Sequence, residues 1–190
     1  DALATGKCHF SRPAVKRDIR LMLLAARRGG IPLIIGSAGS AGGDLNLQWT
    51  VDIVREIAGE ESLHFPMGVI HSEQDREYLK AKLREGKVTP LKPAPPFDDE
   101  VINRSIHIVG MMGHEPIARA LEEGAEVVVG GRASDTTLFA ALPLARGFPE
   151  GPVWHAAKIL ECGAACVALR KSPDCMFATI GKDNFVVEPP

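Results

Sequence analysis

The sequence predicts an α/β fold with a largely parallel β-sheet and helices on both of its faces. Short apolar runs, which are typical of buried strands, alternate along the chain with longer segments whose apolar residues repeat at helical spacing. Glycine-rich turns follow several of these runs directly. The 190 residues are 45% apolar, which is enough to bury one sizeable core. Strands that alternate with helices indicate a parallel sheet joined by crossovers.

The first half of the chain predicts the order helix, strand, helix, strand, helix. Ser11 as N-cap and Pro13 in the first turn indicate where the first helix begins, and a glycine pair ends it. Ser72, with Asp75 three residues later, predicts a capping-box start for the third, highly charged helix. The expected ranges are 12–28, 31–35, 46–58, 63–70 and 73–85.

The second half continues as strand, helix, strand, helix, helix. A proline-rich linker at 92–96 either divides the chain or carries it across an edge of the sheet, and the pattern favours the second interpretation. We therefore expect a single α/β domain over 1–190. Because the chain starts without Met and stops after a strand-like segment, we expect a fragment of a longer protein. The expected ranges are 106–112, 116–123, 126–130, 136–145 and 153–169.

Composition limits the classes of partner. With 22 basic and 24 acidic residues, the net charge is −2, and only 5% of residues are aromatic, so neither charge nor stacking surfaces favour nucleic acid. No apolar stretch has the length of a membrane span, and the first residues lack the pattern of a signal peptide. We expect a cytoplasmic protein that binds a small anionic molecule, and neither nucleic acid nor membrane.

A glycine-rich loop, residues 36–43, separates the first expected strand from the next helix. Glycines allow backbone N–H groups to approach a ligand, and a helix start favours an anion. The spacing matches neither a Walker A loop nor the GxGxxG fingerprint. Close packing of helix against sheet explains the glycines equally well. The candidate anion-binding residues of this loop are Gly36, Ser37, Gly39, Ser40, Gly42 and Gly43.

Topology adds a stronger argument, because each polar, glycine-marked cluster falls where an expected strand gives way to a helix. Such loops emerge together at the carboxyl edge of a parallel sheet, where open α/β sheets bind ligands. We therefore expect the clusters to line one cleft. The clusters are residues 36–44, 71–72, 110–116 and 130–135.

His114 and Glu115 are candidate catalytic residues. They precede Pro116 at an expected helix start, where an imidazole can move a proton and a carboxylate can orient it or act itself. Capping explains both residues as well, because a helix N-terminus favours Glu and adjacent residues do not face each other.

Arg132, Ser134 and Asp135 place a guanidinium, a hydroxyl and a carboxylate within four positions after an apolar strand. Arg132 and Ser134 are candidate binders of a substrate carboxylate or phosphate, and Asp135 is a candidate acid or base. An Arg132–Asp135 ion pair, with Ser134 or Asp135 as a helix cap, is an equal alternative.

No metal site is expected. His155, Cys162 and Cys166 share one face of the last expected helix, but about 10 Å separates the first two at 1.5 Å per residue, so one zinc ion cannot easily bind all three. Small buried cysteines are the commoner explanation. The four cysteines form no CxxC pair, and we expect reduced thiols.

Four segments together resemble the acyclic terpene utilisation family, and the similarity covers nearly the whole chain. The resemblance implies part of a larger N-terminal domain and a pathway that degrades acyclic isoprenoids through acyl-CoA intermediates. It supplies no established catalytic residues. The segments are IIGSAG (34–39), GMMGHEP (110–116), GRASD (131–135) and WHAAKILECG (154–163).

From the residues and the resemblance together, we expect a lyase or hydratase that acts on a carboxylate or acyl-CoA substrate, with the CoA moiety as the implied cofactor group. Arg132 would hold the anion, and His114 or Glu115 would move the proton. The alternatives are a non-catalytic ligand-binding subunit that works with a partner enzyme, and a structural module. A homo-oligomer or a partner subunit is compatible with each.

Overall fold

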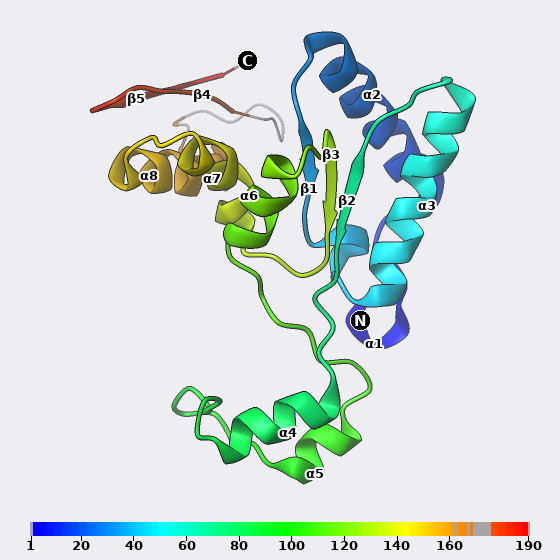
Figure 1. The fold of residues 1–190 in the computed structure, drawn as a ribbon, viewed down its shortest axis with the longest axis vertical. Coiled ribbons are helices and arrows are strands. Elements are labelled where there is room, and N and C mark those ends of the chain that lie inside the picture. The colour runs from blue at the N-terminus through cyan, green and yellow to red at the C-terminus, as the bar shows by residue number, and fades with distance from the viewer. Residues whose placement is uncertain (1, 162, 167, 169–175, 190) are drawn as a thin grey trace.

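The computed structural model describes residues 2–161, 163–166, 168 and 176–189, and it places a small parallel sheet between two layers of helices (Figure 1). The sheet has three strands in the order β1-β3-β2. The middle strand pairs in parallel with both neighbours, Val128 lying opposite Ile34 and Gly68. The strands are β1 (Leu33–Ile35), β2 (Met67–Ile70) and β3 (Val127–Gly130), and a separate antiparallel hairpin contains β4 (Phe177–Ile180) and β5 (Phe185–Glu188).

Helices cover both faces of the sheet, as predicted. Alternate strand residues point to opposite faces, so Val127 and Val129 pack in a core with α2 and α3, whereas Val128 packs with α6 and α7. The described helices are α1 (Ala2–Thr5), α2 (Arg12–Gly29), α3 (Asp44–Glu60), α4 (Arg76–Arg84), α5 (Asp99–Arg104), α6 (Glu115–Glu122), α7 (Asp135–Ala145), α8 (Glu150–Glu161), and the short 3-10 helices η1 (Ala38–Ser40) and η2 (Gly163–Cys166).

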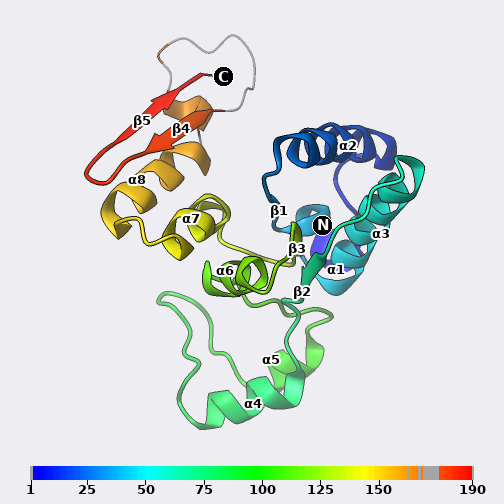
Figure 2. The same cartoon turned by 45° about the horizontal axis from the view of Figure 1, so that its top comes forward.

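The chain makes a long excursion between β2 and α6 that carries α4 and α5. Both helices lie outside the three layers in two views of the molecule (Figure 2). The proline-rich segment 92–96 connects these two helices. Within α4, no residue is buried, as is usual for a helix with many charged side chains.

The structure corrects several of the elements predicted from the sequence. The segment 106–112 is not a strand, because it lies beyond the end of the sheet and makes only isolated bridges, from Val109 to Glu73 and from Met112 to Ala133. The charged helix begins at Arg76 with Asp75 as its cap, since the Asp75 carboxylate accepts the Tyr78 N–H at 2.8 Å.

The last predicted helix, 153–169, begins earlier than expected and ends at Glu161, before the 3-10 turn η2. Three of its predicted positions, residues 162, 167 and 169, lie outside the described residues. The three-stranded sheet is parallel throughout, but β4 and β5 form a separate antiparallel sheet that the sequence pattern did not predict.

Ion pairs join the exposed sides of α2 and α3. Lys16 contacts Glu56 at 2.5 Å and Glu60 at 2.7 Å, Arg12 contacts Glu56 at 2.6 Å, and Arg20 contacts Glu60. The hydrogen bond from Lys16, followed by that from Arg12, lowers the pKa of Glu56 from 4.5 to about 2. The two helices are therefore held together by charge as well as by their apolar faces.

We expect this network to make stability depend on pH at acid values. Because the pKa of Glu56 is lower in the folded protein, its contribution is complete above pH 4.5 and is lost as the pH falls towards 2. Glu56→Gln should lower Tm at pH 7 and flatten the fall of Tm between pH 4.5 and 2. Glu122→Gln, an exposed change on α6, is the control. Equal slopes for Glu56→Gln and wild type would contradict the assignment.

Candidate functional site at the carboxyl edge of the sheet

The four segments predicted to share one edge lie together there. The N–H of Ser37 donates to the Gly131 carbonyl at 2.8 Å, which joins the loop after β1 to the loop after β3. Met112 N–H donates to the Arg132 carbonyl at 3.0 Å, and the Met112 carbonyl accepts the Ser134 N–H at 3.1 Å. The segment before α6 thus runs beside the loop after β3.

Ser72 connects these segments from a buried position. Its hydroxyl donates to the Gly42 carbonyl at 2.7 Å and accepts the Arg132 N–H at 2.7 Å. Its own carbonyl accepts the Gly110 N–H at 2.8 Å. Sequence reasoning placed Ser72 at a helix cap and also in the 71–72 cluster at this edge, but it did not predict these hydrogen bonds.

The glycine loop packs closely against its surroundings. Gly39 and Gly42 have positive φ angles of 62° and 72°. A Cβ on Gly42 would lie 2.2 Å from the backbone nitrogen of Arg132, and one on Gly39 would lie 2.7 Å from the Asn46 carbonyl oxygen. The close-packing interpretation of these two glycines is therefore supported. Ser37 and Ser40 also adopt positive φ angles, of 46° and 78°.

A carboxylate of the protein already occupies the start of α3. Glu73 accepts the Asp44 N–H at 2.9 Å and a hydrogen bond from His107 Nδ1 at 2.5 Å. Burial acts to raise the pKa of Glu73, but these two hydrogen bonds, together with the charges of His107 and Arg76, outweigh it, and the pKa is lowered. Because Gly43 is the N-cap of α3, this carboxylate lies at the Gly42-Gly43 end of the loop, where an anionic ligand was predicted.

Arg132 and Asp135 both carry charges at this edge that have no ion partner within the described part of the chain. The backbone of Arg132 is fixed by Ser72 and Met112, yet no ion pair or hydrogen bond of its guanidinium occurs among the described residues. The alternative Arg132–Asp135 ion pair is likewise absent from that part of the chain. Asp135 is exposed at the start of α7, and Ser134, its N-cap, makes no side-chain capping bond.

His114 is held at the start of α6 by an aromatic neighbour. Its ring meets Trp154 of α8 edge to face, with 5.4 Å between the ring centres. Its Nδ1 lies 3.6 Å from a carboxylate oxygen of Glu115, which is too long for a hydrogen bond. The His114 side chain is 29% exposed and that of Glu115 is 73% exposed. Trp154 is a positioning residue that sequence reasoning did not assign to the site.

Of the residues weighed as zinc ligands, the structure describes His155 and Cys166. His155 meets Phe185 edge to face at 5.0 Å, and Cys166 is exposed in η2, so the prediction of a buried cysteine is wrong there. Cys162 and Cys175 lie outside the described residues. Among the residues that are described, no group of three His, Cys, Asp or Glu side chains is arranged to hold a metal ion.

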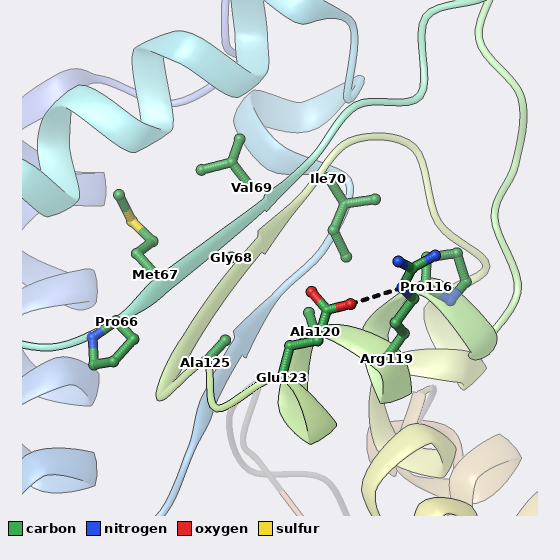
Figure 3. A pocket seen from close by; sticks show the side chains of 10 residues that line it. All are labelled: Pro66, Met67, Gly68, Val69, Ile70, Pro116, Arg119, Ala120, Glu123 and Ala125. Atoms are coloured by element: carbon green, nitrogen blue, oxygen red, sulfur yellow. Dashed lines mark hydrogen bonds and ion pairs between the residues drawn. The ribbon is translucent and has the colours of Figure 1, made fainter.

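Two hollows flank the sheet. A groove of about 340 Å³ runs between the edge strand β2 and α6, and there Arg119 is neutralised by Glu123 at 2.8 Å (Figure 3). A second hollow of about 330 Å³ lies between α2 and the Gly36–Ser40 part of the loop. Arg119 therefore has an ion partner, whereas the Arg132 guanidinium has none among the described residues. None of the described helices is long and apolar enough to cross a membrane.

Comparison with known proteins gives one match. The model of the family described as "Acyclic terpene utilisation family protein AtuA" matches residues 9–168, which include all four segments of the carboxyl edge. No curated protein and no solved structure matches the chain.

Proposed function

The chain belongs to the acyclic terpene utilisation family, and on that premise we propose that it carries out a lyase or hydratase step on a carboxylate or acyl-CoA intermediate of acyclic terpene breakdown. The observation that carries the proposal is Arg132. A guanidinium with a fixed backbone and without a partner among the described residues, at the edge where open α/β sheets bind ligands, suits a carboxylate or phosphate.

The remaining roles follow from position. Met112 and Ser134 fix the loop of Arg132 to the segment that leads into His114, so the imidazole and the guanidinium belong to neighbouring, hydrogen-bonded segments. In hydration or dehydration, a proton and a hydroxyl group are added to or removed from adjacent carbons. His114 would transfer the proton, Arg132 would hold the anionic group, and the exposed Glu115 and Asp135 are secondary candidates for proton transfer.

One observation favours the alternative of a non-catalytic ligand-binding subunit. At 3.6 Å from Nδ1, the Glu115 carboxylate does not orient the His114 ring by a hydrogen bond, whereas many acid–base histidines are oriented in that way. In that case Arg132 would still bind the anion, and His114 would contribute little to turnover by a partner enzyme.

A thermal-shift titration of the full-length protein tests the proposal. The ligands are CoA, isoprenoid acyl-CoA esters, the corresponding free acids and divalent metal ions. A ligand that binds only the folded state stabilises it by about 2.7 kcal/mol at one hundred times Kd. We expect acyl-CoA esters or free acids to raise Tm. An absence of any shift across these ligands would overturn the proposal.

A further inference from the structure

The hollow beside α2 is lined mainly by apolar side chains, some of which stay exposed among the described residues. It has a volume of about 330 Å³, at the lower end of the range of small-molecule sites. Val15 and Met22 of α2, Ile35 of β1 and Trp49 of α3 form its walls, and Phe10 lies at its border. Phe10 is 69% exposed and Met22 is 46% exposed, although burial of such side chains is favourable.

The charge around this cavity does not suit an ionic ligand. Among the residues that line it, Asp18 carries a carboxylate, and Arg17 neutralises that carboxylate at 2.7 Å. The Ser40 hydroxyl is engaged by Cys8 Sγ and by the His9 N–H, each at 3.2 Å. An uncharged, aliphatic group fits these walls better than a phosphate or carboxylate.

One end of the cavity adjoins the edge that carries Arg132. Ser37 lines the cavity, and its hydroxyl donates to the Ala133 carbonyl at 3.2 Å, directly beside Arg132 in the chain. The Ser37 N–H donates to Gly131 in the same segment. Ser37 therefore lies both on the wall of the cavity and beside the backbone of residues 131–133, the segment that contains Arg132.

We infer that this cavity binds the aliphatic chain of a small amphiphilic ligand whose anionic end lies at the Arg132 edge. The identity of the anionic end rests on the proposed function, and the position of the aliphatic chain rests on the cavity. The ligand class is a medium-length, branched or linear carboxylic acid or its thioester. A purely polar anion of the same charge lacks the part that fills the cavity.

Cys8 lines the cavity and reports its occupancy directly. The full chain is treated with iodoacetamide in the presence of citronellate, decanoate or acetate, and alkylation is followed peptide by peptide with mass spectrometry. We expect citronellate and decanoate to slow alkylation of Cys8 about tenfold at ten times Kd, because about a tenth of the sites then remain free. Alkylation of the exposed Cys166 should not change, and acetate should protect neither thiol.

A variant in which a larger side chain fills the cavity provides a second test. Ala14 of α2 lines the cavity and is half-buried, whereas Ala25 of the same helix is exposed and lies outside the lining. Ala14→Trp should abolish protection of Cys8 by citronellate, and the matched Ala25→Trp should retain it. If Ala14→Trp does not fold, protection of Cys8 in the wild-type protein alone decides whether the cavity binds the ligand.

Failure of this inference differs from failure of the proposed function. Unprotected Cys8 at citronellate concentrations that raise Tm would overturn the cavity assignment and leave the anion site at Arg132 intact. Protection of Cys8 that persists in Arg132→Gln with unchanged affinity would support the cavity and contradict Arg132 as the anion-binding residue.

Discussion

Gly42→Ala is expected to lower the free energy of unfolding by at least about 2 kcal/mol, or Tm by roughly 4–8 °C for a chain of this size. Two costs add. A side chain at the φ angle of 72° is strained, and its Cβ would lie 2.2 Å from the Arg132 nitrogen. That neighbour is backbone held by Ser72, so it cannot move aside without loosening the other segments of the edge.

Gly59→Ala is the matched control for this substitution. Gly59 lies near the end of α3, and a Cβ there meets no atom within 4 Å. This change should leave stability unchanged or raise it by up to about 1 kcal/mol, because alanine favours helix more than glycine does. Thermal or urea unfolding of both variants measures this difference in stability. A Gly42→Ala protein as stable as wild type would show that the loop does not pack closely against the Arg132 segment.

His114→Gln is expected to reduce kcat of the full-length protein about 10²–10⁴-fold on the substrate identified by ligand binding, with little change in KM. The helix start should survive, because the bond to the Ala118 N–H comes from the backbone carbonyl of His114. The substitution removes an imidazole that can accept or donate a proton, and it keeps a polar side chain beside Trp154.

His64→Gln serves as the control, because His64 is exposed in the loop before β2. Steady-state kinetics should show that kcat falls in His114→Gln and stays at the wild-type value in His64→Gln. Full turnover by His114→Gln, together with unaltered ligand affinity, would support the non-catalytic binding subunit and contradict proton transfer by this residue.

The core of the fold was predictable because its signals are local. Apolar residues at helical spacing indicate the helix α2. Short, continuous apolar runs indicate the strand before Gly36 and the buried strand 127–130. The segment 106–112 shares that apolarity without being a strand. Its position beyond the end of the sheet depends on the excursion through α4 and α5, which no local pattern reveals.

The site was predictable in outline and not in its contacts. Parallel topology alone placed the loops at one edge. The two roles of Ser72 depend on Gly42 and Arg132, which lie 30 and 60 residues away. The contact of Glu73 with the start of α3 and that of Trp154 with His114 also join distant parts of the chain. No local sequence pattern indicates such contacts, because the two residues of each pair are far apart in the chain.

The affinity of the full-length protein for an isoprenoid acyl-CoA ester and its free acid, measured by calorimetry for wild type and Arg132→Gln, tests the central claim most directly. A charge-assisted hydrogen bond contributes about 1.5–3 kcal/mol, so we expect Kd to rise roughly 10- to 100-fold in Arg132→Gln. Arg119→Gln, which removes the paired arginine of the β2 groove, should bind as wild type does. Equal affinity of Arg132→Gln and wild type, or a loss confined to Arg119→Gln, would contradict the assignment of the anion site to the carboxyl edge.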